Sequence, residues 1–264
     1  MVYPRLLAVV VGLLAVVAVP AGCTAIGIGV CDDPDPEELF EAAFVHDDDL
    51  EVVHGERTTA VSGGNDTRTE RIEVTERPYV TYRSEVLDSD VPQREGTQYV
   101  SNATGSWSYD PSADVVTAYE ADAPYENDAV REARAQQAER QLEYYDLTYR
   151  GTRTIADREA HVLDIEAKPE TAETGISLFI GDSELILYAV ETVDPAEELT
   201  VVEQTVWIDA EYRYPLQERL VVEGPTGDRY EMTERFETVT FNTAIEDDRF
   251  VFDPPANATV QEWD

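Results

Sequence analysis

Basic side chains are scarce in this chain of 264 residues, which has 19 Lys and Arg against 56 Asp and Glu and a net charge of −37. Lys168 is its only lysine. Such a surface repels phosphate groups, which excludes binding of nucleic acid or of an anionic membrane through the general surface. Only salt screens the mutual repulsion of so many acids. We therefore expect a protein of a halophilic archaeon, whose acid clusters are solvated surface rather than metal ligands.

Cysteine is nearly absent, since Cys23 and Cys31 are the only two and both lie near the N-terminus. Disulfides, zinc–thiolate sites and a catalytic thiol are therefore excluded from the remainder of the chain. The three histidines are not at metal-ligand spacing, and no G-x-S-x-G, S-x-x-K or glycine-rich phosphate motif occurs. We expect no enzyme, no metal and no cofactor. A glycosidase-type carboxylate pair stays open, because acids are too frequent for any one pair to stand out.

The N-terminus has the order of a secretory signal. Arg5 precedes an uncharged run from Leu6 to Val19, which is shorter than the roughly 20 residues of a membrane span. Ala21-Gly22-Cys23 then resembles a lipobox, although Pro20 stands where such motifs usually carry a larger aliphatic residue.

These features predict a signal peptide over residues 1–22, lipidation of Cys23, and a tether with an acidic spacer over residues 23–35. An uncleaved membrane anchor is the alternative. Either arrangement places the remaining domain, residues 36–264, on the outer face of the cytoplasmic membrane. Three N-x-T sequons in turn-like sequence are candidates for surface glycosylation of an exported chain: Asn65, Asn102 and Asn257.

The hydrophobic pattern predicts a mainly β domain with two helices. Asp35, Pro36 and Glu38 form a helix start, so we expect a helix to about His46 with an apolar face that includes Phe40 and Phe44. From Leu50 the period changes to two, which predicts about eleven antiparallel strands joined by short turns. A second helix over residues 127–145, with a thin stripe that includes Leu142, interrupts them.

Residues 175–190 are the most apolar stretch of the domain. They suggest an inserted hairpin or short helix packed on the sheet, or alternatively an apolar flap at a cavity mouth or a lipid contact. Aromatic side chains also fall on predicted strands where they could face one concave surface: Trp107, Tyr109, Tyr119, Trp207 and Phe241. A curved sheet with helices across its open side can hold an apolar ligand. The alternative is that these aromatics fill the core.

Four short motifs follow the first helix in a fixed order. They are Arg77-Pro78, Trp107-Ser108-Tyr109-Asp110-Pro111, Trp207-Ile208-Asp209 and Phe250-Val251-Phe252-Asp253-Pro254-Pro255. Across about residues 36–260 this series resembles the LolA/LolB/LppX/RseB superfamily of exported lipid- and lipoprotein-handling domains.

The resemblance implies an unclosed antiparallel β half-barrel covered by helices, with an apolar cavity for the acyl chains of a lipid or a lipoprotein. It also implies that Arg77 contacts the helical lid. We expect the cavity to be lined by Phe40, Phe44, Val80, Tyr82, Trp107, Tyr109, Tyr119, Leu142, Trp207 and Phe241. A membrane-anchored carrier or receptor is the first interpretation. The alternative is an RseB-like sensor or interaction module with a protein partner.

Overall fold

The computed structural model describes residues 33–64, 66–168, 200–224 and 226–262. All the elements below belong to the unit Pro34–Asp264. The predictions for residues 1–22, Cys23, Asn65 and residues 175–190 fall outside the described residues and stay predictions.

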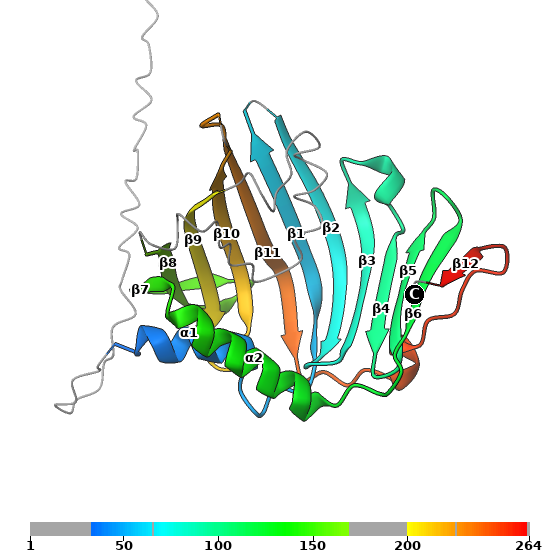
Figure 1. Ribbon diagram of the computed structural model, residues 1–264, viewed down its shortest axis with the longest axis horizontal. Coiled ribbons are helices and arrows are strands. Elements are labelled where there is room, and N and C mark those ends of the chain that lie inside the picture. Colours follow the sequence, from blue (N-terminus) through cyan, green and yellow to red (C-terminus); the bar gives the residue numbers. More distant parts are fainter. Residues whose placement is uncertain (1–32, 65, 169–199, 225, 263–264) are drawn as a thin grey trace, which may run out of the picture. The chain divides into compact units, whose positions relative to one another are not determined.

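The strands of the described residues form one sheet of twelve (Figure 1). Its strand order is β12-β6-β5-β4-β3-β2-β1-β11-β10-β9-β8-β7, so β12 and β7 are its two edges and the sheet does not close on itself. The predicted unclosed α+β half-barrel is confirmed. The strands are β1 (Val53–Gly63), β2 (Asp66–Arg77), β3 (Thr81–Ser89), β4 (Gln98–Asn102), β5 (Gly105–Asp110), β6 (Val115–Glu120), β7 (Tyr145–Ile155), β8 (Arg158–Ala167), β9 (Thr200–Asp209), β10 (Pro215–Glu223), β11 (Arg229–Phe241) and β12 (Thr259–Glu262).

Strand β12 departs from the expected count of about eleven antiparallel strands. It pairs in parallel with β6, with Thr259 beside Val115. All four of its side chains are exposed, so it lacks the alternation of apolar and polar residues that identifies a strand in sequence. It also follows Pro254-Pro255 closely, in a segment that sequence patterns indicate as coil.

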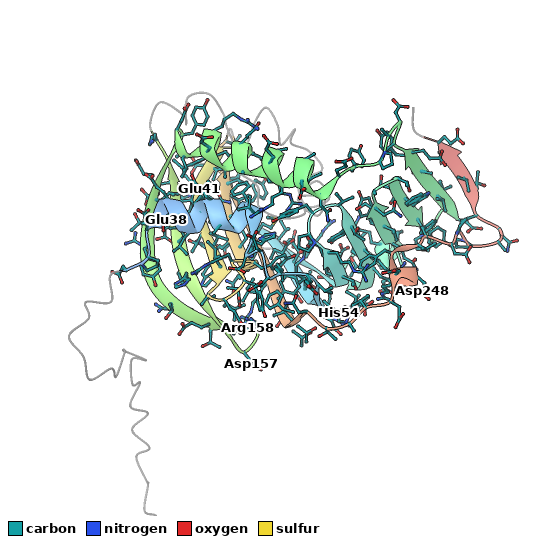
Figure 2. All side chains as sticks on the ribbon, turned by 90° about the horizontal axis from the view of Figure 1, so that it is seen from below. Glu38, Glu41, His54, Asp157, Arg158 and Asp248 are labelled. Atoms are coloured by element: carbon teal, nitrogen blue, oxygen red, sulfur yellow. The ribbon has the colours of Figure 1, made fainter. Side chains whose placement is uncertain are left out.

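Among the described residues, two α-helices and two short 3₁₀ turns accompany the sheet, namely α1 (Pro36–Val45), α2 (Asn127–Leu142), η1 (Pro92–Arg94) and η2 (Asp247–Phe250). The Asp35 side chain accepts a hydrogen bond from the Glu37 amide at 2.9 Å, so it caps α1 as its position predicts. The helices lie side by side against the sheet (Figure 2). In the described part of the chain, no helix combines the length and apolarity needed to cross a bilayer.

Both helices pack on one end of the sheet, formed by β7, β8 and β9, which we name the covered end. Its buried side chains come from α1, α2 and these strands: Leu39, Phe40, Ala43, Ala138, Tyr145, Leu163, Ile165, Val206 and Ile208. Apart from the Tyr145 hydroxyl, these side chains carry no polar atom. Only Ala138 of α2 is buried. The burial of this apolar surface against α1 and the strands explains why α2 packs on the sheet.

The C-terminal motif packs on the convex face of the sheet. Phe252 stacks on Trp107 with ring centroids 6.5 Å apart, and buried Phe250 lies beneath the Arg77 guanidinium, 5.0 Å from its carbon to the ring centre. Three of the four motifs therefore contact one another, and these contacts hold the segment that leads to β12 against the sheet.

The remaining motif, Trp207-Ile208-Asp209, lies at the turn between β9 and β10. Asp209 is fully buried and accepts hydrogen bonds from the Arg158 guanidinium at 2.5 and 3.1 Å and from the amides of Glu211 and Tyr212. Arg158 also lies 4.6 Å from the ring centre of Phe241. This arrangement stabilises the turn.

Candidate functional site

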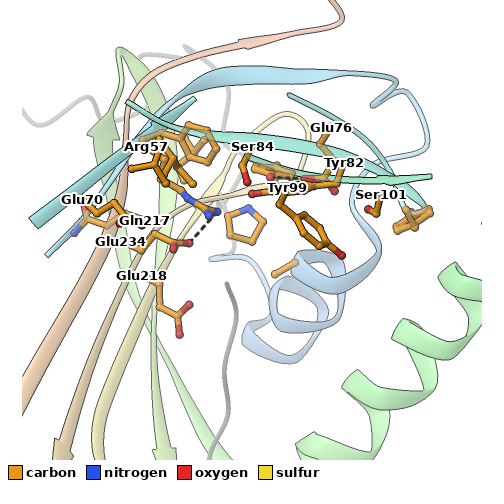
Figure 3. A pocket seen from close by; sticks show the side chains of 18 of the residues that line it. Arg57, Glu70, Glu76, Tyr82, Ser84, Tyr99, Ser101, Gln217, Glu218 and Glu234 are labelled. Carbon is orange, nitrogen blue, oxygen red and sulfur yellow. Dashed lines mark hydrogen bonds and ion pairs between the residues drawn. The ribbon is translucent and has the colours of Figure 1, made fainter. Parts of the chain in front are cut away.

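Next to the covered end, the concave face of the sheet encloses a hollow of about 910 Å³ (Figure 3). Its walls come from α1, α2 and strands β1 to β6, β10 and β11, together with η1 and the segments beside them. The lining residues are Ala43, Phe44, His46, Arg57, Glu70, Ile72, Glu76, Tyr79, Tyr82, Ser84, Val86, Arg94, Thr97, Tyr99, Ser101, Ser108, Thr117, Arg134, Gln137, Tyr214, Pro215, Leu216, Gln217, Glu218, Glu234 and Phe236.

Strand alternation decides which side chains reach the hollow. On β3 the lining residues are Tyr82, Ser84 and Val86, and on β5 the lining residue is Ser108. Because successive strand residues point to opposite faces, Trp107 and Tyr109 on either side of Ser108 face the convex side. The W-x-Y motif therefore places its serine, and not its aromatics, in the hollow.

The wall beneath the helices is aromatic and centred on Tyr79. The Tyr79 hydroxyl donates to the carbonyl of Val45 at the end of α1, and its ring stacks on His46 with centroids 5.9 Å apart. The Arg134 guanidinium of α2 lies 5.3 Å from the centre of the same ring. Asn127, the first residue of α2, accepts a hydrogen bond from the Tyr79 amide at 3.4 Å. Tyr79 thus joins the sheet to both helices.

Two buried titratable groups, His46 and Glu76, belong to the lining at this wall. Burial, assisted by the Arg134 charge, lowers the pKa of His46 to about 4, so its ring is neutral at pH 7. Burial raises the pKa of Glu76, although the hydrogen bond that it accepts from the Tyr214 hydroxyl at 2.8 Å acts in the opposite direction. Both shifts follow from the cost of placing a charge away from water.

The deep part of the hollow is charged, unlike the apolar cavity that the sequence suggested. We call Arg57, Glu70, Arg94, Glu218 and Glu234 the floor. Arg57 pairs with Glu234 at 3.0 Å, and the Arg94 guanidinium grips Glu70 with two hydrogen bonds of 2.6 and 2.9 Å. The Glu218 carboxylate accepts a hydrogen bond of 2.6 Å from the buried amide of Gln204. Such groups persist in a protein interior only when they are paired in this way.

The structure brings few of the predicted cavity residues to this hollow. Phe44 and Tyr82 line it, and their role in lipid binding stays a prediction. Phe40 and Leu142 pack in the core of the covered end instead. Trp207 and Phe241 pack against a second core cluster, around Leu216 and Phe236.

The remaining predicted cavity residues also lie elsewhere. Trp107 stacks on Phe252, and the Tyr109 hydroxyl donates to Asp114 at 3.2 Å, both on the convex side. Tyr119 is exposed and accepts a hydrogen bond from the hydroxyl of Tyr125 at 3.4 Å. The carbonyl of Val80 accepts a hydrogen bond from Ser101 at 3.5 Å, and Val80 does not line the hollow.

Arg77 contacts the C-terminal segment in this structure. Its guanidinium donates to Asp247 at 2.7 Å and to the carbonyl of Ile245 at 2.6 Å. The physical reason is again alternation, since Glu76 faces the hollow and Arg77 therefore faces the other way. The contacts with α1 and α2 that we expected of Arg77 are made by Tyr79, two residues further on.

Two of the three glycosylation candidates lie in the described residues. The Asn102 side chain is half-buried, donates to the Phe250 carbonyl at 3.3 Å, and accepts from both the amide and hydroxyl of Thr104. Asn257 is exposed in a turn. Of the two, only Asn257 presents an amide that is accessible as it stands.

The charged floor was missed because acids are so frequent in this chain that no single one attracts notice. A usable signal was present on β2, where Glu70, Ile72, Val74 and Glu76 share one face. Among the described residues, no group of three His, Cys, Asp or Glu side chains is placed to hold a metal ion.

No family model and no curated protein matches this sequence. Solved structures do resemble it. The complex of MucA and MucB from Pseudomonas aeruginosa aligns at 12% identity and a TM-score of 0.44, over 83% of this chain and 62% of that one. A LolA superfamily protein from Nitrosomonas europaea aligns at 9% identity and 0.35, over 83% and 99% of the two chains.

The lipoprotein LppX from Mycobacterium tuberculosis aligns at 10% identity and a TM-score of 0.36, over 81% of this chain and 99% of that one. These neighbours are of the LolA, LppX and RseB (MucB) kinds that the motif series resembles.

Proposed function

We propose that this chain is an exported, membrane-anchored protein that binds a lipid, or the acyl part of a lipoprotein, in the hollow, as a carrier or receptor without catalysis. The observation that carries this proposal is the hollow itself. Its volume of about 910 Å³ lies within the range of about 300–1,000 Å³ that is usual for ligand pockets. Burial of an acyl chain there would contribute about 0.8 kcal/mol per CH₂.

The lining suits a ligand with both an apolar and a polar part. Aromatic and aliphatic side chains form part of the lining: Phe44, Tyr79, Tyr82, Tyr99, Tyr214, Leu216 and Phe236. The floor carries paired charges (Figure 3). A purely apolar ligand would cover these charges without replacing their contacts with water, which is unfavourable. An amphiphile satisfies both regions.

The anchor and the habitat are part of the proposal. The leader sequence supports lipidation of Cys23 and a position on the outer face of the cytoplasmic membrane, and the net charge of −37 supports a haloarchaeal source. Mass spectrometry of the mature N-terminus tests the lipid, and an uncleaved Met1 would contradict it. Loss of the fold on transfer to low salt tests the habitat, and unchanged melting would contradict it.

The binding function is tested by extracting the full-length chain, purified from its own membranes, and identifying bound lipid by mass spectrometry. Ser84 lines the hollow on β3, so Ser84→Trp fills it and should abolish the co-purifying lipid. The matched control is Leu87→Trp, at an exposed position of the same strand. Lipid that is absent from the wild type, or that is equally present in both variants, contradicts the proposal.

A second candidate is an interaction module of the RseB kind that takes a segment of a protein partner. The observation in its favour is the charged floor, because a peptide supplies polar groups that an acyl chain lacks. Cross-linking on membranes before and after lipid extraction separates the two. A module that recognises protein keeps its cross-linked partner after extraction, and it loses that partner in Ser84→Trp.

A further inference from the structure

Eight hydroxyl side chains lie next to one another on the concave face of β3, β4, β5 and β6, and we name them the hydroxyl platform. Strand register joins them into two neighbouring rows that cross these four strands. The first row consists of Tyr82, Ser101, Ser106 and Tyr119, and the second of Ser84, Tyr99, Ser108 and Thr117. All of them except Ser106 and Tyr119 line the hollow, and Figure 3 shows four of the lining members together on one side of it.

The acidic and basic residues of the lining lie on other elements than the platform. They are Arg57 of β1, Glu70 and Glu76 of β2, Arg94 of η1, Arg134 of α2, Glu218 of β10 and Glu234 of β11. His46, which follows α1, has a pKa of about 4 and is neutral at pH 7. Among the described residues that line the hollow, those of β3, β4, β5 and β6 carry no charge. The hollow thus has a charged side and an uncharged side, whatever the pairing among its charges.

An uncharged polar surface of this kind is unexpected for a strand face in so acidic a chain. Solvated strand positions elsewhere commonly carry charge, as Asp146 and Arg153 of β7 and Glu237 of β11 do. The opposite face of the platform strands packs against the C-terminal segment, where Trp107 stacks on Phe252. The platform resembles neither a solvated acidic surface nor a packed core, which favours a ligand with matching polar groups.

Hydroxyl groups and tyrosine rings together match the chemistry of a sugar. A serine, threonine or tyrosine hydroxyl both donates and accepts hydrogen bonds, and so does each hydroxyl of a sugar. The rings of Tyr82 and Tyr99 lie 6.0 Å apart, and Tyr99 and Tyr119 are 39% and 40% exposed, so flat apolar ring surface is open to the C–H face of a pyranose. Tyrosine and serine combine rigid contact area with adaptable hydrogen bonding at a low cost in conformational entropy. A charged head group finds no opposite charge on the platform.

Resting on the binding function proposed above, we propose that the hydroxyl platform is a subsite for the uncharged sugar head group of an amphiphile. The apolar chain of that amphiphile then contacts the apolar part of the lining, such as Phe44 and Leu216. Neighbouring strands lie 4.7–4.9 Å apart, so the four strands of the platform span about 14 Å. That width exceeds one pyranose ring, and a disaccharide head group should therefore bind more tightly than a monosaccharide.

The test compares three uncharged ligands with one dodecyl chain, namely dodecyl maltoside, dodecyl glucoside and a dodecyl polyethylene glycol ether. The ether chain of the third ligand accepts hydrogen bonds but does not donate them. Calorimetric titration of the full-length chain is done at high salt, where repulsion among its acids is screened, and below the micelle concentration of each ligand. We expect dodecyl maltoside to bind about tenfold more tightly than the ether, the effect of one or two additional hydrogen bonds, with the glucoside between them.

A double variant separates the hydroxyl groups from the rest of the hollow. Ser108 and Thr117 are cross-strand partners, so Ser108→Ala with Thr117→Val removes two neighbouring hydroxyls and leaves every ring and charge in place. It should lower dodecyl maltoside affinity about tenfold and leave the affinity for the ether unchanged. The matched control is Thr148→Val with Thr154→Val, which removes two hydroxyls at exposed positions of β7 and should change neither affinity.

Each other outcome counts against the proposal in its own way. Equal affinity for the glycosides and the ether, or equal losses in the two double variants, overturns the sugar subsite while the binding function stands. Free maltose that binds as tightly as dodecyl maltoside shows recognition of a free glycan and overturns the amphiphile head group. A cross-linked protein partner that the platform variant loses, with no glycoside bound, assigns the platform to protein and overturns the proposal. If neither the glycosides nor the ether bind, the lipid-binding function is overturned as well.

Discussion

The covered end and the hollow share one sheet yet are built from opposite kinds of side chain. In the covered end, Leu163, Ile165, Val206 and Ile208 meet the helices with no charged group between them. Beside it, the same concave face carries Arg57, Glu70, Glu218 and Glu234, all nearly inaccessible to solvent. The difference teaches that the helices stabilise one end of the sheet by apolar packing, while the other end buries paired charges beside a hollow. Four predictions test this division, beginning with the largest expected effect.

Breaking the charged floor should destabilise the protein most. Arg57→Met leaves Glu234 buried without this ion pair, which should lower the free energy of unfolding by about 3–5 kcal/mol, as measured by chemical denaturation. Adding Glu234→Leu should recover most of that loss, because the charge is then gone. Arg219→Met, which breaks a more exposed network with Glu203 and Glu231, is the control and should cost about 1 kcal/mol or less. Equal losses at the two arginines would contradict the division.

Truncation in the covered end should cost more than truncation at the hollow. Leu163 is fully buried, so Leu163→Ala opens a dry cavity and should lower the unfolding free energy by about 2–5 kcal/mol. Tyr82 borders the hollow, so in Tyr82→Ala the surrounding side chains lose fewer contacts than they do in Leu163→Ala. We expect a clearly smaller loss in the same denaturation assay. If Tyr82→Ala proves as costly as Leu163→Ala, the hollow is packed like the core.

His46, at the border of the two regions, should make the free energy of unfolding depend on pH. Its pKa is about 4 in the folded chain against 6.5 when unfolded, so the unfolded state takes up the proton first as the pH falls. The contribution of His46 is thus present above pH 6.5 and is lost between about pH 6.5 and 4, in total about 3 kcal/mol. His46→Asn keeps a residue that tolerates the positive φ of 51° and removes the titration. Identical pH dependence of unfolding in the two proteins would show that the ring is not buried neutral.

Tyr79 should hold the helices over the hollow. Of the four predictions, removal of its hydroxyl group should have the smallest effect on the free energy of unfolding. Tyr79→Phe removes the hydrogen bond to the Val45 carbonyl and should cost about 1 kcal/mol. Hydrogen exchange should become faster in α2 and at the end of α1, while β8 and β9 stay protected. Tyr144→Phe, at an exposed tyrosine beyond α2, should change neither region. Faster exchange throughout the sheet would mean that Tyr79 supports the whole fold rather than the helices.

Much of the fold followed from local chemistry. Asp35 and Pro36 predict the start of α1, and the alternation from Leu50 onward predicts an antiparallel sheet, because capping and pleating act over a few residues. The aromatic residues of the site were harder to place. Trp107 and Tyr109 lie on a strand as predicted but point away from the hollow, since one residue of register exchanges the two faces.

What the sequence alone determined is the mainly β architecture with two helices, the absence of cysteine from the sheet and helices, and the strongly acidic character of the chain. Only the tertiary structure decided which acids are solvated and which are buried, because Glu218 and Glu237 are alike as residues in strands. Their difference arises when β10 and β11 pair and curve. Glu218 is then placed beside Glu234 inside the hollow, and Glu237 is placed in solvent.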